Sequence, residues 1–289
     1  MNFIARCYRC LGLPGRALFF LTLAIYLLLF HRRVLLDITA QVQTLMKVCH
    51  GEVAMPPTAL FYVLTWFAAL CQCRFGILMG AAAAVLAGLL TARWWATRHI
   101  FQDYFGKQNA ETRQSGWLAF VLSFVSSLPT QDLWLHGDYI MGQPSPNYWM
   151  NGTVLASWPF AVVLFWQSYQ QLLRPETGWW RRMLLWLVLL AVSKPSYALV
   201  FVVVYPLFLV GRHGFRRTVR GHFVPIALLG ILIILEYYLV FLQKDSIYVR
   251  EFNRGRASGV DVCLFCTWKL YSSNILVSIL AAVAFPLGV

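Results

Sequence analysis

Phe75-Gly-Ile-Leu-Met-Gly-Ala-Ala-Ala-Ala-Val-Leu-Ala-Gly-Leu-Leu-Thr-Ala92 is an apolar run without a charged side chain. A helix that crosses a bilayer needs about 20 mainly apolar residues, so this run predicts a membrane-spanning helix. Seven further apolar runs lie at residues 17–30, 59–70, 117–128, 155–173, 183–210, 223–242 and 270–289. We expect the shorter runs to borrow flanking residues or not to cross. Long continuous runs, rather than short alternating strands, predict an all-α, polytopic transmembrane helical bundle.

The composition points to the same class. The 289 residues are 60% hydrophobic and 12% charged, against about 25% charged in a typical soluble domain. This excludes an ordinary soluble enzyme and predicts an integral membrane protein with the lipid bilayer as a partner. Residues 1–289 are interpreted as a single transmembrane domain, because no internal repeat or linker is visible. The chain ends inside an apolar run, Phe285-Pro-Leu-Gly-Val289, so we expect a fragment truncated at the C-terminus.

The net charge of +13 comes from short basic clusters between the apolar runs. Such clusters are typical of topology signals and lipid-headgroup contacts, so no nucleic-acid partner is expected. The clusters that we assign to the cytoplasm are Arg6, Arg9 and Arg16, then Arg174, Arg181 and Arg182, then Arg212, Arg216, Arg217 and Arg220. The run at 183–210 must then leave and return, and Ser193-Lys-Pro-Ser196 is the predicted turn because proline breaks a helix.

The count of crossings then decides which loops face outward. With an outer loop at 31–57, spans at 59–70 and 75–92 would bring residues 93–115 outside as well. A full span at 117–128 would put the basic cluster at Arg174 on the outer side, against its charge. We therefore expect 117–128 to be re-entrant or interfacial, with 93–156 as one outer region whose polar part is about 129–156.

Asp37 lies in Val34-Leu-Leu-Asp-Ile-Thr-Ala-Gln-Val-Gln-Thr-Leu-Met46, just after the first predicted span. The spacing of apolar residues predicts an amphipathic helix on the membrane surface, with Asp37 near its start. The alternative interpretation is that Asp37 stabilises the positive end of this helix or neutralises Arg33.

Two other polar stretches are candidate sites. Turn formers and amides fill Met141-Gly-Gln-Pro-Ser-Pro-Asn-Tyr-Trp-Met-Asn-Gly-Thr153, and polar backbone at membrane depth belongs beside a cavity or water. Asp132, His136 and Asp138 have ligand types that suit a divalent cation, although a hydrated turn gives the same pattern. The cysteines are interpreted as small hydrophobic residues.

These features together resemble the GT-C superfamily of multi-span glycosyltransferases. The resemblance rests on an acid just beyond the first span, a surface helix and Gly51-Glu-Val-Ala-Met-Pro-Pro57, followed by Gly142-Gln-Pro-Ser-Pro-Asn147, Asn151-Gly-Thr153 and Ser193-Lys-Pro-Ser196. It implies a bacterial cell (inner) membrane enzyme that moves a sugar from a polyprenyl-phosphate donor to a glycan, lipid or protein acceptor of the cell envelope.

The resemblance also implies roles for particular residues. Asp37 would be the catalytic base. Substrate binding would fall to Gln143, Asn147 and Asn151 for sugar hydroxyls, and to Lys194 and Arg254 for the donor phosphate. A divalent cation is a candidate cofactor. Two other classes stay open: a transporter or flippase with broken helices at Gly142–Pro146 and Lys194-Pro195, and a non-catalytic scaffold of envelope polysaccharide assembly.

Overall fold

All regular secondary structure in the described part of the chain is helical. The computed structural model describes residues 12–31, 37–56, 58–105, 111–124, 151–173 and 180–215, together with 227–228, 230–232, 234–235 and 238. The ordered elements are α2 (Gly12–His31), α3 (Asp37–Cys49), α4 (Leu60–Ala68), α5 (Phe75–Phe105), α6 (Glu111–Phe124), α8 (Gly152–Leu173), α9 (Trp180–Ser193) and α10 (Pro195–His213). No strand occurs among these residues, so the expectation of an all-α protein is confirmed in that range.

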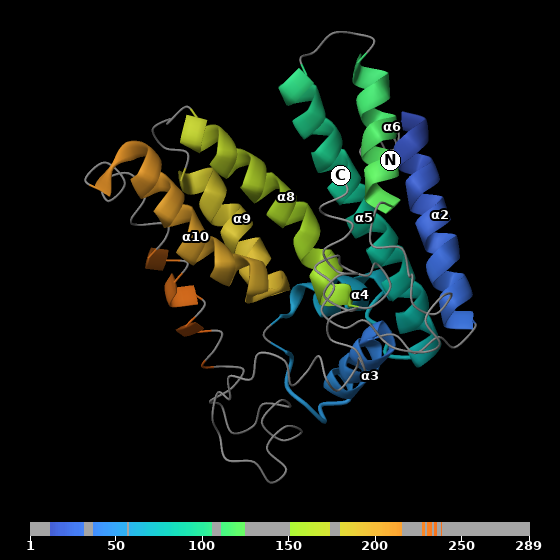
Figure 1. Cartoon of the computed structure of the whole chain (residues 1–289). Helices are drawn as coiled ribbons and strands as arrows, with labels where there is room; N and C mark the ends of the chain where they lie inside the picture. The colour runs from blue at the N-terminus through green and yellow to red at the C-terminus, as the bar shows by residue number, and fades with distance from the viewer. Residues whose placement is uncertain are drawn as a thin grey trace, which may run out of the picture.

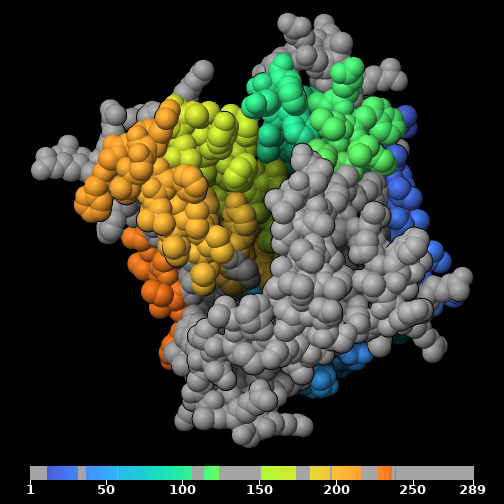
Figure 2. All heavy atoms as spheres, viewed as in Figure 1, coloured from blue at the N-terminus to red at the C-terminus, as the bar shows by residue number. Residues whose placement is uncertain are grey.

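The long helices run up and down, and the short helices α3 and α4 lie at one end of them (Figure 1). Two hydrophobic clusters hold the helices together. The first joins α2, α3, α4, α5, α6 and the start of α8. The second joins the rest of α8 to α9 and α10. Figure 2 shows the two halves side by side, with α8 and α10 in yellow and orange and α5 and α6 in green. Helix α8 belongs to both clusters and connects the halves.

Trp94 is the central residue of the first half. Its side chain is 0% exposed, and its indole N–H donates to the backbone oxygen of Gly116 on α6 at 2.9 Å. Gly15 on α2 faces the same ring, where a β-carbon would come within 2.5 Å of the indole. The missing side chain therefore allows α2 to pack directly on Trp94, and one buried ring joins α2, α5 and α6.

Two of the described helices are long and apolar enough to cross a membrane: α2 and α5. The apolar run at 59–70 gives only the nine residues of α4. At 1.5 Å per residue α4 is about 14 Å long, less than half of the roughly 30 Å hydrocarbon core. The expectation of a span at 59–70 is therefore wrong. The helix stops where Leu70 and Cys71 take the left-handed backbone conformation, with φ of 53° and 60°.

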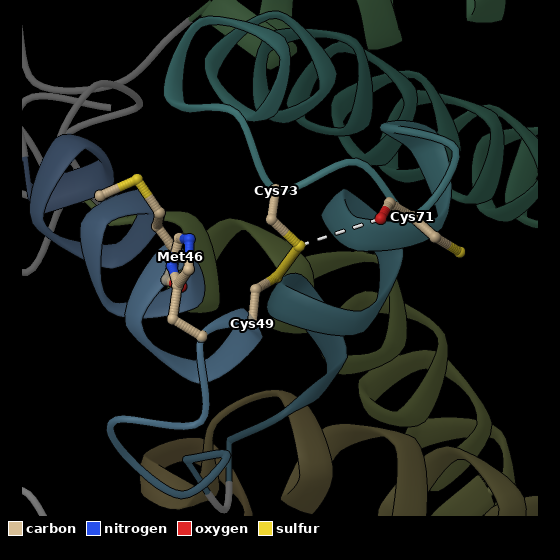
Figure 3. Close-up of a disulfide and its surroundings, with 5 residues drawn as sticks. Met46, Cys49, Cys71 and Cys73 are labelled. Carbon is tan, nitrogen blue, oxygen red and sulfur yellow. Dashed lines mark hydrogen bonds between the residues drawn. A yellow bond between two sulfur atoms is a disulfide. The ribbon is translucent and has the colours of Figure 1, made fainter.

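A disulfide joins the two sides of α4. Cys49, at the end of α3, is bonded to Cys73, just before α5, with their Cα atoms 6.1 Å apart (Figure 3). Cys71 is a free, exposed thiol that points away from this bond in the same view. The interpretation of Cys49 and Cys73 as small hydrophobic residues is thus wrong. The covalent bond keeps both flanks of α4 at the same end of the bundle.

The predicted turn at Ser193-Lys-Pro-Ser196 is confirmed. Helix α9 ends at Ser193, Lys194 is extended with φ −166° and ψ 119°, and α10 begins at Pro195. Proline suits the first position of a helix because its missing N–H would have no partner there. A residue before proline is pushed out of the helical region, which explains the break at Lys194.

Candidate functional site

Helix α3 is held to the start of α8 by the side chain of Gln41. The amide Nε2 of Gln41 donates to Oδ1 of Asn151 at 2.9 Å, and its Oε1 accepts from the backbone N–H of Gly152 at 3.0 Å. One glutamine side chain therefore uses both ends of its amide across 110 residues of sequence. Because Gln41 is half-buried, losing either bond would leave a polar group poorly solvated.

Asn151 caps the N-terminus of α8. Its Oδ1 accepts from the backbone N–H groups of Thr153 at 3.1 Å and Val154 at 3.3 Å, and from the hydroxyl of Thr153 at 2.7 Å. Asparagine is among the preferred residues at this position, because its oxygen satisfies N–H groups that have no partner inside the helix. Asn151 is thus a structural residue, and its predicted contact with a sugar stays a prediction.

Gly152 is the point of closest approach between α8 and the surface layer. It is buried, and a β-carbon there would lie 2.7 Å from Cζ of Phe61 on α4 and 2.8 Å from Oε1 of Gln41. Phe61 is 1% exposed, so it has little room to move. Any larger residue at position 152 would place its β-carbon against Phe61 and Gln41, so glycine allows α3, α4 and α8 to pack this closely.

Asp37 and Lys194 both lie at this end of the bundle (Figure 1). Asp37 is exposed on the first turn of α3, one turn before Gln41 on the same face. Burial lowers the pKa of Lys194, and the negative charge of Asp37 acts in the opposite direction. The structure therefore places the two groups at one end of the bundle (Figure 1), although they are far apart in sequence.

The first turn of α10 adds positive potential beside Lys194. Lys194 occupies the N-cap position but makes no side-chain hydrogen bond to the helix. The first N–H groups of a helix have no partner within it and attract anions, as does an ammonium group. Asp37 and Lys194 thus combine a carboxylate that can accept a proton with a cationic position suited to a phosphate.

The outcome for the other predicted residues is simple. Asn151 lies at the same end of the bundle as Asp37 and Lys194. Gln143, Asn147 and Arg254 lie outside the described residues, as do the metal candidates Asp132, His136 and Asp138. Within the described ranges no group of three or more His, Cys, Asp or Glu side chains could hold a metal ion.

Sequence reasoning missed Gln41, Gly152 and the disulfide. Gln41 shares a helix face with Asp37, and that spacing was the available signal. Nothing local indicates its partners, because they follow 110 residues later.

No family model matches this sequence, and comparisons with curated proteins and with solved structures give no match.

Replacing Gly152 with alanine tests the close contact. We expect Gly152→Ala to lower the thermal midpoint of the detergent-purified protein, because the new methyl group overlaps Phe61 and Gln41 and the neighbouring helices must separate. Overpacking of this kind typically costs about 1–3 kcal/mol. Gly88→Ala on α5 is the matched control, since a β-carbon there meets nothing within 4 Å. The contact is unimportant if both variants melt alike.

Proposed function

We propose that this protein is a multi-pass membrane glycosyltransferase that moves a sugar from a polyprenyl-phosphate donor to a cell-envelope glycan, lipid or protein. The observation that carries the proposal is that Asp37, on the first turn of α3, and Lys194, at the start of α10, lie at the same end of the bundle (Figure 1). A lipid-linked donor explains why such groups would sit at one end of an apolar bundle. It also requires no nucleotide-binding fingerprint, and none is found in the sequence.

The proposal includes an orientation in which this end faces outward. Disulfides persist in oxidising compartments, which supports an outer position for Cys49 and Cys73. At the other end of the helices lie Arg16 at the start of α2 and Arg212 at the end of α10. The sequence adds Arg174 directly after α8, and Arg181 and Arg182 near the start of α9. Basic residues concentrate on the cytoplasmic side. The disulfide-bonded cysteines and the basic residues therefore favour the same orientation.

If residues 59–70 do not cross the membrane, the number of crossings agrees with a cytoplasmic position for all three basic clusters. We infer that the chain crosses at α2, α5, α6, α8, α9 and α10 in alternating directions, with α3 and α4 outside. The end of α5 and the start of α6 would then face the cytoplasm, in place of the outer position expected for residues 93–115 from the sequence. Helices α6 and α9 have 14 residues each and would need flanking residues to complete a crossing.

In the proposed reaction the acceptor hydroxyl gives its proton to the carboxylate of Asp37 while its oxygen attacks the anomeric carbon of the donor. The bond from that carbon to the phosphate oxygen breaks, with inversion at carbon. The leaving phosphate keeps the electron pair, and its charge is stabilised by the ammonium of Lys194 and the first N–H groups of α10. No proton needs to reach the leaving group.

Cysteine labelling tests the orientation. In a protein whose Cys7, Cys10, Cys71, Cys263 and Cys266 are replaced by serine, Gln43→Cys on the exposed side of α3 should react with a membrane-impermeant maleimide added to intact cells. Asp103→Cys, exposed near the end of α5, should react only after the membrane is opened. Labelling of position 103 from outside would restore the outer region at 93–156 and a re-entrant 117–128.

Substitution of the acid tests the reaction. Asp37→Asn keeps the size of the side chain but cannot accept the proton, so transfer from a polyprenyl-phosphate sugar should fall by about 10²–10⁴-fold. Expression and donor binding should stay near those of the parent, since Asp37 is exposed. Glu52→Gln, an exposed acid just after α3, is the control and should transfer normally. Transfer within a few-fold of the parent by Asp37→Asn would remove the catalytic role.

Donor binding tests Lys194. We expect Lys194→Met to weaken the binding of a polyprenyl-phosphate sugar by about 10–100-fold, the usual effect of losing a charged hydrogen bond. The ammonium form binds phosphate, and burial lowers its pKa. Binding by the parent should therefore decline with rising pH earlier than an ordinary lysine would allow, whereas the Met variant should lack this step. Lys47→Met, an exposed lysine at the end of α3, is the control. Equal affinities in the two variants would reduce Lys194 to a headgroup contact.

A further inference from the structure

A cavity of about 530 Å³ lies between α5, α6 and α8, beside the first turn of α10. Its walls are largely apolar, as Ile100, Leu122 and Val162 illustrate. The hydroxyl of Thr97 donates to the backbone oxygen of Arg93 at 3.0 Å, and that of Ser123 donates to its own helix in the same way. Among the described residues that line the cavity, Arg93 is the charged one.

The guanidinium of Arg93 is held against the ring of Trp158. Its Cζ lies 4.3 Å from the ring centroid, which fixes the plane of the guanidinium by a cation–π contact between α5 and α8. Arg93 is half-buried within a helix that is apolar enough to cross a membrane. A charge in such a helix is expensive, so it faces the bundle interior or a cavity, where it pairs with other groups or meets a ligand.

An apolar groove continues from this cavity. The groove has a volume of about 340 Å³ between α8 and α10, and it shares Phe165 and Tyr197 with the cavity. Leu172, Val204 and Phe208 lie along it. A compartment with one fixed cation that leads into an apolar groove matches an amphiphile with an anionic head. A planar guanidinium fits phosphate oxygens in two parallel hydrogen bonds, so phosphate is the complementary head group.

We propose that this cavity binds a lipid phosphate, with the phosphate on Arg93 and the hydrocarbon chain in the groove between α8 and α10. The site goes beyond sugar transfer, because binding there needs neither Asp37 nor Lys194. Two sources share this chemistry: a polyprenyl phosphate and a phospholipid of the surrounding bilayer.

Native mass spectrometry of the detergent-purified full chain tests the site. The probes are a polyprenyl phosphate, the matching polyprenol without phosphate, and phosphatidylglycerol. We expect Arg93→Gln to weaken binding of the phosphate-bearing probe about tenfold or more, and to leave polyprenol binding unchanged. Arg93→Lys should recover part of the affinity. Arg74→Gln removes the same charge from an exposed position just before α5 and should bind like the parent.

A second variant keeps the test independent of the folding of Arg93→Gln. Val162→Trp fills the cavity while Arg93 stays in place, and it should lose the phosphate-bearing probe. Tighter binding of polyprenyl phosphate would assign the site to an isoprenoid carrier, and tighter binding of phosphatidylglycerol to bulk lipid. Parent-like affinity in both Arg93→Gln and Val162→Trp, or equal binding of polyprenol and polyprenyl phosphate by the parent, overturns the proposal. Because no sugar is transferred, failure here is distinguishable from failure of the transferase proposal.

Discussion

The amide of Gln41 is the constraint on which the α3 end of the bundle depends. It forms hydrogen bonds with the side chain of Asn151 and the backbone N–H of Gly152. Gln41 is half-buried, so water could not fully replace these two hydrogen bonds. Asp37 is one helical turn before Gln41, so the stiffness of α3 carries this constraint to the carboxylate. The position of Asp37 relative to the start of α8 therefore depends on a contact in which Asp37 takes no part.

The two hydrophobic clusters give this contact its setting. Helix α8 packs on α5 through its first turns and on α9 and α10 through its later turns. Lys194 is half-buried at the break between α9 and α10, and this burial lowers the pKa of the lysine. The cation–π pair of Arg93 and Trp158 joins α5 to the first half of α8.

The sequence predicts a local feature of the site where a single backbone or side-chain preference decides the local structure. The repeat of apolar residues predicts α3, and the structure buries Ile38, Val42 and Leu45 on it as expected. Proline chemistry predicts the break at Lys194. The run at 59–70 was misinterpreted because hydropathy counts apolar residues but does not locate a helix end. The left-handed backbone at Leu70 and Cys71 ends α4, and neither residue type signals such a turn.

The sequence by itself determined the all-helical class of the described residues, the approximate position of most of their helices, and Asp37 at the start of α3. These follow from side-chain periodicity and backbone preferences, which act over one or two turns. The sequence did not predict that α5 continues past Ala92 to Phe105, where an outer region was expected. Only the tertiary structure decided the disulfide between Cys49 and Cys73, the close packing of Gly152 against Phe61, and the hydrogen bond from Gln41 to Asn151. Those contacts join distant segments, and their partners are chosen by how whole helices pack rather than by any local pattern.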